Sequence, residues 1–113
     1  MTKDFIILNL LFGWEIIHLS KKGNKLTIRL REFKDHPSRF IRITFTRCSV
    51  AAFLDFNSAQ TDDFSLFEFK GCIFYKAEID KENIVSIHLL RGNELVGAIK
   101  IQPLEISFDF TTK

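Results

Sequence analysis

The sequence predicts a single, mainly β domain that covers residues 1–113. We expect an antiparallel β-sandwich or a partly open barrel of seven to eight strands, with at most one or two short helices. Three observations predict this class. Apolar and polar residues alternate through most of the chain, turn-forming clusters separate these runs at short intervals, and no long helical period lies between them. One domain suits the length, because compact domains commonly have about 100 to 150 residues.

The start of the chain predicts a helix, a strand and a turn. The continuous apolar run "TKDFIILNLLF" does not reveal by its period whether it is helix or strand, and we expect a short helix there. The segment "GWEIIHLS" predicts the first strand. The cluster "KKGN" at residues 21–24 is a turn signal, so this strand and the next should form a hairpin.

Two further strands are predicted on either side of a second turn signal, "DHPS" at residues 35–38. The run "KLTIRLREF" before that turn alternates between apolar and polar residues, and so does "RFIRITF" after it. We expect the apolar members of both runs to face the core, namely Leu26, Ile28, Leu30, Ile41, Ile43 and Phe45.

The middle of the chain predicts a strand and a loop. The segment "CSVAAFLDF" at residues 48–56 is a second continuous apolar run, which we expect to be a bulged strand. The stretch at residues 57–65 is the longest polar loop. Some loops of this kind carry functional residues, but more of them only connect two strands. Both roles are compatible with the sequence of this loop.

The last third predicts further strands, with turn signals at residues 80–83 and 91–94 and a break at Pro103. Each strand should direct its apolar residues to one face, with Phe108 buried. These sets are Ile73, Tyr75, Ala77 and Ile79, then Val85, Ile87 and Leu89, and finally Leu104, Ile106, Phe108 and Phe110.

The sequence offers little support for catalysis or for a cofactor. His18, His36 and His88 lie far apart and match neither a helical metal motif nor a nucleophile with its base, although a triad assembled in space stays possible. Cys48 and Cys72 match no ligand spacing and are expected to be buried free thiols. We therefore predict no catalytic residue, no metal site and no cofactor, and hence a protein that is not an enzyme.

The carboxylates and glycines likewise give little support for a metal site or a nucleotide-binding site. Asp62 and Asp63, with Asp55 nearby, lack the spaced acidic ligands and the turn glycine of a calcium loop. The five glycines are scattered, and none begins a helix after a strand, which argues against a nucleotide-binding loop. No apolar run approaches the roughly 20 residues that span a bilayer, so we expect a cytoplasmic protein without a membrane partner.

Charge is the most informative feature of the sequence. Residues 1–50 carry ten Lys and Arg against four Asp and Glu, whereas residues 51–113 carry six against ten. If the two parts form separate surfaces, the first attracts an anionic partner. If they interleave in one sheet, their charges neutralise each other.

The polar side of the predicted strand pair forms a candidate binding surface of Lys25, Arg29, Arg31 and Arg42. Pairing the two strands antiparallel sets either Arg31 or Arg29 opposite Arg42, and directly opposed like charges are destabilising. A nearby carboxylate, an acidic partner protein or a phosphate backbone would offset this repulsion. The candidate carboxylates are Glu78, Asp80, Glu105 and Asp109.

Nucleic acid is the weaker partner class. Proteins that bind single strands place exposed aromatic residues among basic ones, and here only Phe33 and Phe40 fall in phase with the basic positions. A net charge of +2 is also modest for neutralising many phosphates.

The order of "GWEIIHLSKKGNKLTIRLREF", "RFIRITFTRCSVAAFLDF" and "GNELVGAIKIQPLEISFDF" resembles the small, β-rich immunity proteins of bacterial polymorphic toxin systems. Members often carry a His-Asp-small-residue signature where this chain has Gly13, Trp14 and Glu15, so no functional residue is transferred. The resemblance implies a cytosolic, non-enzymatic protein that binds and blocks a toxin. We expect a protein-binding domain, and the resemblance implies that it is such an inhibitor. The alternative is a module that binds an anionic ligand or nucleic acid, and a small enzyme ranks third.

Overall fold

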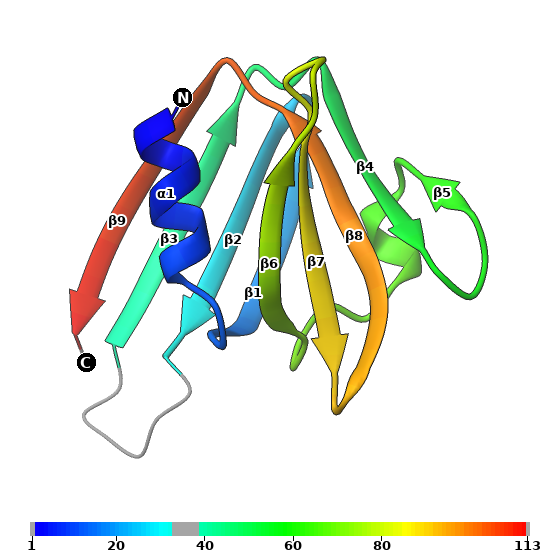
Figure 1. Cartoon of the computed structure of the whole chain (residues 1–113), viewed down its shortest axis with the longest axis horizontal. Helices are drawn as coiled ribbons and strands as arrows, with labels where there is room; N and C mark the ends of the chain where they lie inside the picture. The colour runs from blue at the N-terminus through cyan, green and yellow to red at the C-terminus, as the bar shows by residue number, and fades with distance from the viewer. Residues whose placement is uncertain (1, 33–38, 113) are drawn as a thin grey trace.

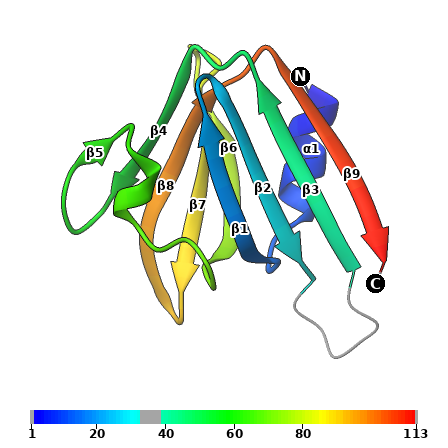
Figure 2. The same cartoon turned by 180° about the vertical axis from the view of Figure 1, so that it is seen from behind.

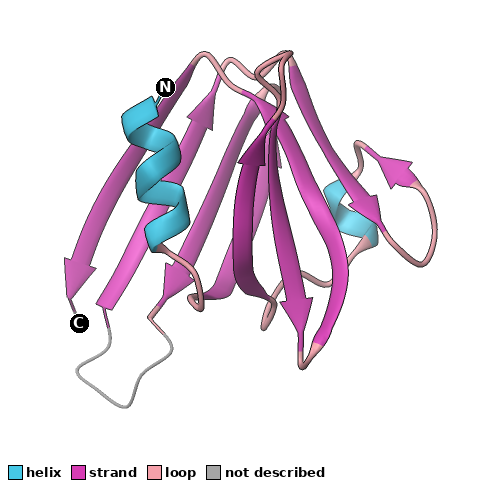
Figure 3. Cartoon of the chain, viewed as in Figure 1, coloured by secondary structure: helices cyan, strands magenta, loops and turns pink. Residues whose placement is uncertain are grey.

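The structure, a computed structural model, is mainly β and has one α-helix among the residues that it describes, 2–32 and 39–112. Helix α1 spans Thr2–Leu10, and a short 3-10 helix, η1, spans Phe64–Leu66. The β class and the helix near the start of the chain are confirmed. The strands, which dominate Figure 3, are β1 (Glu15–Lys22), β2 (Lys25–Arg31), β3 (Arg39–Thr46), β4 (Val50–Asp55), β5 (Gln60–Thr61), β6 (Ile73–Ile79), β7 (Val85–Arg91), β8 (Glu94–Gln102) and β9 (Glu105–Thr112).

The described strands form a single antiparallel sheet in the order β5-β4-β8-β7-β6-β1-β2-β3-β9. This order is linear, so the sheet is not closed, and β5 and β9 are its two edges. There are nine strands rather than the seven to eight expected, and the shortest of them is the two-residue β5, which lies within the segment predicted to be a loop.

The sheet has two parts that meet at β1 and β6. Glu15 and Ile73 form the paired position between these strands, and the Ile16 N–H donates to the Cys72 carbonyl oxygen at 2.7 Å beside it. Figures 1 and 2 show β2, β3 and β9 on one side of this joint and β7, β8 and β4 on the other. We call β1, β2, β3 and β9 the β9 half, and β4 to β8 the β8 half. The chain crosses between the halves after β3 and again after β8.

Two-residue turns fix the registers of two hairpins. In the turn between β1 and β2, Gly23 has a φ of 60°, and in the turn between β7 and β8 Gly92 has a φ of 65°. Glycine adopts this left-handed conformation without steric cost, which explains the glycine at the first position of both turns. The first turn sets Lys22 opposite Lys25. The predicted turn at residues 35–38 lies outside the described residues.

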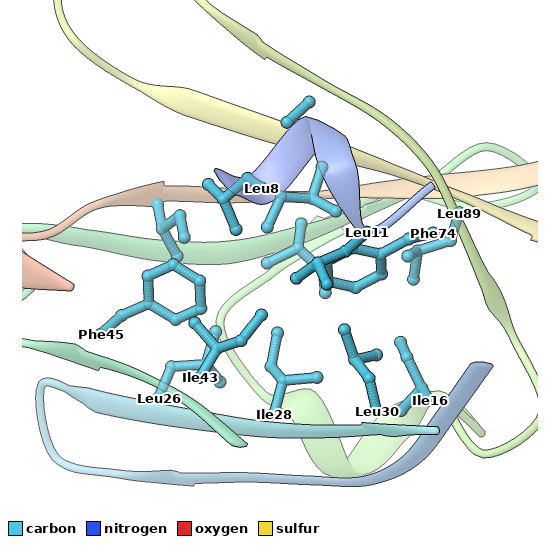
Figure 4. Packing of buried hydrophobic residues seen from close by; sticks show 14 of the residues in the cluster. Leu8, Leu11, Ile16, Leu26, Ile28, Leu30, Ile43, Phe45, Phe74 and Leu89 are labelled. Atoms are coloured by element: carbon cyan, nitrogen blue, oxygen red, sulfur yellow. The ribbon is translucent and has the colours of Figure 1, made fainter. Parts of the chain in front are cut away.

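The core lies between the two halves of the sheet and α1. Leu8 and Leu11, from α1 and the turn after it, pack against the inward residues of the β9 half, as Figure 4 shows. The predicted inward face is confirmed, because its residues are all 0 or 1% exposed: Leu26, Ile28, Leu30, Ile41, Ile43 and Phe45. Full burial of side chains of this size contributes about 1.5 to 3 kcal/mol each.

A β-bulge changes the predicted face of β6. The register with β7 shifts between Phe74 and Lys76, so one extra residue stands on β6 and the alternation slips there. Phe74 is therefore buried and Tyr75 is 38% exposed, and the prediction that Tyr75 shares a face with Ala77 was wrong. In β4 the strand was predicted correctly, but it pairs with β8 without a register shift, so the expected bulge was wrong.

Strand β9 keeps the predicted alternation but buries less of it. Ile106 and Phe108 pack partly against the core, whereas Phe110 is 58% exposed, and Leu104, which lies just before the strand, is 65% exposed. The expectation that Phe108 would be buried was therefore too strong. The reason is the position of β9 at the edge of the sheet, where β3 covers one side of the strand and no described strand covers the other.

Replacing Phe108 with Ala should lower the free energy of unfolding by roughly 1 to 2 kcal/mol, because only part of the ring leaves water on folding. Urea denaturation of both proteins measures this difference. A loss of about 3 kcal/mol or more, which is typical of a fully buried Phe, would mean that the ring lies in the core.

Candidate functional site: the basic face of the β9 half

The β9 half presents a polar face on the side of the sheet opposite to the core. The four residues predicted as a binding surface all lie on this face, and all four are exposed. We call them the basic face: Lys25, Arg29, Arg31 and Arg42. They come together because alternate residues of a strand share one face, and because β2 and β3 pair without a register shift.

The register places Arg29 directly opposite Arg42, and this is one of the two arrangements that the sequence left open. Arg31 is opposite Phe40 instead. On the other side of β2, Arg29 faces His18 of β1. Arg29 thus lies between an arginine and a histidine of the two adjacent strands.

Two of the four cations have carboxylate partners in the sheet. Arg42 Nη2 donates to Asp109 Oδ2 of β9 at 2.9 Å, and Arg31 Nη2 donates to Glu15 Oε1 of β1 at 2.6 Å. Asp109 was among the candidate carboxylates, whereas Glu15 was not. Both arginine side chains stay about half exposed, and ion pairs at such positions contribute only about 0 to 1 kcal/mol each.

The other candidate carboxylates are engaged elsewhere. Glu105 lies 3.7 Å from Arg47, and Asp80 accepts hydrogen bonds from the backbone of its own turn. Glu78 contacts Lys76 at 3.4 Å and His88 at 3.1 Å. The hydrogen bonds and charges of Lys76 and His88 lower the pKa of Glu78.

Lys25 and Arg29 have no ion-pair partner among the described residues. Lys25 is opposite Lys22 at the end of the hairpin, and these two lysines, with Ser20 and Thr27, line a shallow hollow of about 150 Å³. Uncompensated positive charge therefore gathers on the hairpin side of the basic face, at Lys22, Lys25 and Arg29.

Sequence reasoning missed Lys22 as a member of this face. Strict alternation from Glu15 would put Lys21 outward, but β1 has a bulge between Ile16 and His18 that shifts the phase of the strand. The two-residue Gly-Asn turn held the missing signal, because it sets Lys22 opposite Lys25 and so on the same face.

Phe40 is the aromatic residue of this polar face that the structure describes, and it is partly buried. Phe33, the other aromatic residue predicted in phase with the basic positions, lies outside the described residues. The face therefore offers one incompletely exposed ring, and it also carries the carboxylates Glu15 and Asp109 beside the arginines.

Other polar residues form no candidate metal centre within residues 2–32 and 39–112. No group of three or more His, Cys, Asp or Glu that could hold a metal ion occurs there. Cys48 and Cys72 are buried free thiols as predicted, and burial raises the pKa of each. His36 lies outside the described residues. In the described part of the chain, no helix is both long and apolar enough to cross a membrane.

Two further hollows lie away from the basic face. One of about 410 Å³ separates the β1–β2 hairpin from the polar loop, where Lys21 Nζ donates to the Asp62 carbonyl oxygen at 3.1 Å. The other, of about 430 Å³, lies between α1 and the end of the β9 half and includes Phe110. We call the second one the α1 groove, and sequence reasoning did not foresee it.

Within the α1 groove, Arg39 forms a bidentate ion pair with Glu32. Arg39 Nε donates to Glu32 Oε1 at 2.8 Å, and Arg39 Nη2 donates to Glu32 Oε2 at 2.6 Å. The same guanidinium lies 5.8 Å from the centre of the Trp14 ring. Hydrogen bonding to Glu32 raises the pKa of Arg39, which stays charged.

Searches with this chain against protein-family models, curated proteins and solved structures found no match.

Proposed function

We propose that the protein is a non-enzymatic protein-binding domain that recognises an acidic surface of its partner through Lys22, Lys25 and Arg29. The observation that carries this proposal is the lack of ion-pair partners for Lys25 and Arg29 among the described residues, while Arg31 and Arg42 beside them are paired. The uncompensated cations stand on two paired strands, which hold their backbone positions before the partner arrives. Such charges mainly accelerate association and set specificity.

Three features of this face favour a protein partner over nucleic acid. It offers one partly buried aromatic ring for stacking, whereas proteins that bind single strands use several. Its carboxylates Glu15 and Asp109 would repel phosphates that approach the paired arginines. The net charge of +2 is small as well. A face that carries charges of both signs suits a protein partner, whose acidic surface is not uniformly anionic as a phosphate backbone is.

An immunity-type inhibitor is the form of protein binding that we propose. The resemblance of the sequence to immunity proteins of bacterial polymorphic toxin systems implies a cytoplasmic protein that binds a toxin and blocks it. A rigid sheet that presents uncompensated cations on an open face suits this task, because the inhibitor needs affinity and specificity but no chemistry of its own. Anionic-ligand or nucleic-acid binding is the second candidate, and the Lys22 and Lys25 hollow favours it.

The test compares two double variants used as bait and then as purified proteins. Lys25→Ser with Arg29→Ser removes two cations from the basic face. Lys70→Ser with Lys81→Ser removes the same charge from exposed positions elsewhere. Once affinity capture from the native host has identified a partner, stopped-flow kinetics should show association roughly three- to tenfold slower for the first variant at low salt, and the difference should shrink as salt rises.

The control variant should associate at the wild-type rate. An equal loss in both variants would mean that net charge rather than this face steers the partner, and the proposal would fail. If the captured material is nucleic acid, the second candidate replaces the first. Arg42→Ser with Asp109→Ser serves as a further comparison, because this variant removes both members of an ion pair without changing the net charge and should leave the association rate close to that of wild type.

A further inference from the structure

Strand β9 is a long open edge of the sheet. It has eight residues, whereas β5 at the opposite edge has two. Proteins usually protect exposed edges with short strands, prolines, lysines or bulges, because an open edge can pair with another strand. β9 contains no Pro or Lys, and it pairs with β3 over eight consecutive positions without a bulge. The described part of the chain supplies no strand on its other side.

The hydrogen bonds of β3 show which residues of β9 face the open edge. Glu32 N–H donates to the Arg39 carbonyl oxygen at 2.8 Å, so the odd-numbered residues of β3 direct their backbone groups to β2. The even-numbered residues of β3 therefore bond β9, and their partners there are Glu105, Ser107, Asp109 and Thr111. Within β9, the N–H and C=O groups left at the open edge are those of Ile106, Phe108, Phe110 and Thr112.

The first three of these residues carry the apolar side chains of the strand. Ile106 and Phe108 are partly buried, and Phe110 is 58% exposed. Phe110 also borders the α1 groove, where Leu10 and Phe12 are 72% and 62% exposed. An incoming strand would thus meet both unpaired backbone groups and uncovered apolar surface at one place.

We propose that the occupant of this edge is β9 of a second copy of the chain, paired antiparallel about a two-fold axis at Phe108. In that register Phe108 faces Phe108 of the second copy, and Ile106 faces Phe110. Residues with free backbone groups then bond each other, and apolar side chains stay on one face. Each carboxylate meets a neutral residue, because Asp109 faces Ser107 and Glu105 faces Thr111.

The neighbouring registers are less favourable for a physical reason. A pairing centred on Ser107 would set Glu105 opposite Asp109 twice, and one centred on Asp109 would set Asp109 opposite itself. Like charges directly opposite each other destabilise a strand pair. The register centred on Phe108 pairs residues 105–111 of the two copies without such an opposition. It also joins the two sheets with both basic faces on the same side.

The test measures self-association of the 13.2 kDa chain by sedimentation equilibrium over a range of concentrations, with charge substitutions at Ser107. Ser107→Lys should tighten the dimer, because each new ammonium group faces Asp109 of the other copy. Ser107→Asp should weaken the dimer, because the new carboxylate of each copy faces the Asp109 carboxylate of the other copy. With two such pairs per dimer, each change should shift the dissociation constant by roughly two- to thirtyfold.

Ser58→Lys and Ser58→Asp are the matched controls, since they make the same charge changes in the exposed loop before β5, and neither should alter the dissociation constant. Phe110→Pro removes an N–H at the open edge that β3 does not use, so it should abolish the dimer, and a thermal melt checks that it still folds. Weakening by both Ser107 variants would indicate the register centred on Ser107 and contradict ours. A wild-type chain that stays monomeric up to about 1 mM, or a dimer indifferent to these variants, would overturn the proposal.

Discussion

Replacing Phe53 with Ala should lower the free energy of unfolding by about 3 to 5 kcal/mol, one of the largest effects expected from a single substitution in this chain. Phe53 is 0% exposed and lies in β4. Its ring centre is 4.5 Å from that of Phe67 and 4.8 Å from that of Phe69. Removing the ring loses the transfer free energy of its atoms and leaves a cavity among aromatic neighbours that cannot fully close it.

Urea denaturation of wild type and variant measures this loss. Phe56→Ala is the matched control, because the same ring three residues later is 45% exposed and should cost about 1 kcal/mol or less. Equal effects of the two substitutions would mean that the neighbouring rings of Phe53, Phe67 and Phe69 do not form part of the core. Only a difference of about 2 kcal/mol or more supports the packing described above.

Replacing Gly97 with Ala should also destabilise the protein, by about 1 to 3 kcal/mol or more. Gly97 is buried in β8, between Asp55 of β4 and Leu89 of β7. A Cβ at this position would press against Cζ of Phe53 and would lie 2.5 Å from the Leu54 carbonyl oxygen. Because one of these neighbours is backbone, β4 would have to shift away from β8.

A double-mutant cycle separates the two contacts. Phe53→Leu shortens the side chain that the new methyl group meets, so the cost of Gly97→Ala should fall in the Phe53→Leu background without vanishing. The part that remains measures the contact with the Leu54 carbonyl oxygen. Strictly additive free energies would contradict this account, since residues in contact are expected to couple by about 0.5 to 3 kcal/mol.

Alternation predicted the faces of β2 and β3 well. Each of β2 and β3 has one solvent-facing and one buried face. The polar residues on either side of Leu26 and Ile43 in the sequence are therefore enough to predict that these two side chains face the core. It failed where a bulge intervenes. The bulges beside Ile16 and Phe74 move Lys22 outward and Tyr75 into solvent. A bulge depends on pairing with another strand, and local sequence carries little trace of it.

The candidate site could be predicted in its membership but not in its electrostatics. Arg29 and Arg42 share a phase that any reader of the sequence can see. Whether each has a counter-charge depends on strands brought in from elsewhere, as when Asp109, 67 residues away, reaches Arg42. Phe108 illustrates the same limit, because only the order of strands shows that β9 lies at an edge.

The double crossing of the chain between the two halves has a consequence for the order of folding. β3 acquires its second neighbour only from residues 105–112, so during synthesis on the ribosome its far edge stays bare until those residues have emerged. Strands this far apart in the sequence can pair only after a long loop has closed, and the entropy lost in closing it slows folding. Folding dominated by such pairings takes milliseconds to seconds. The nascent β1–β2–β3 meander is therefore the species on which a chaperone, or premature association of neighbouring chains, would act.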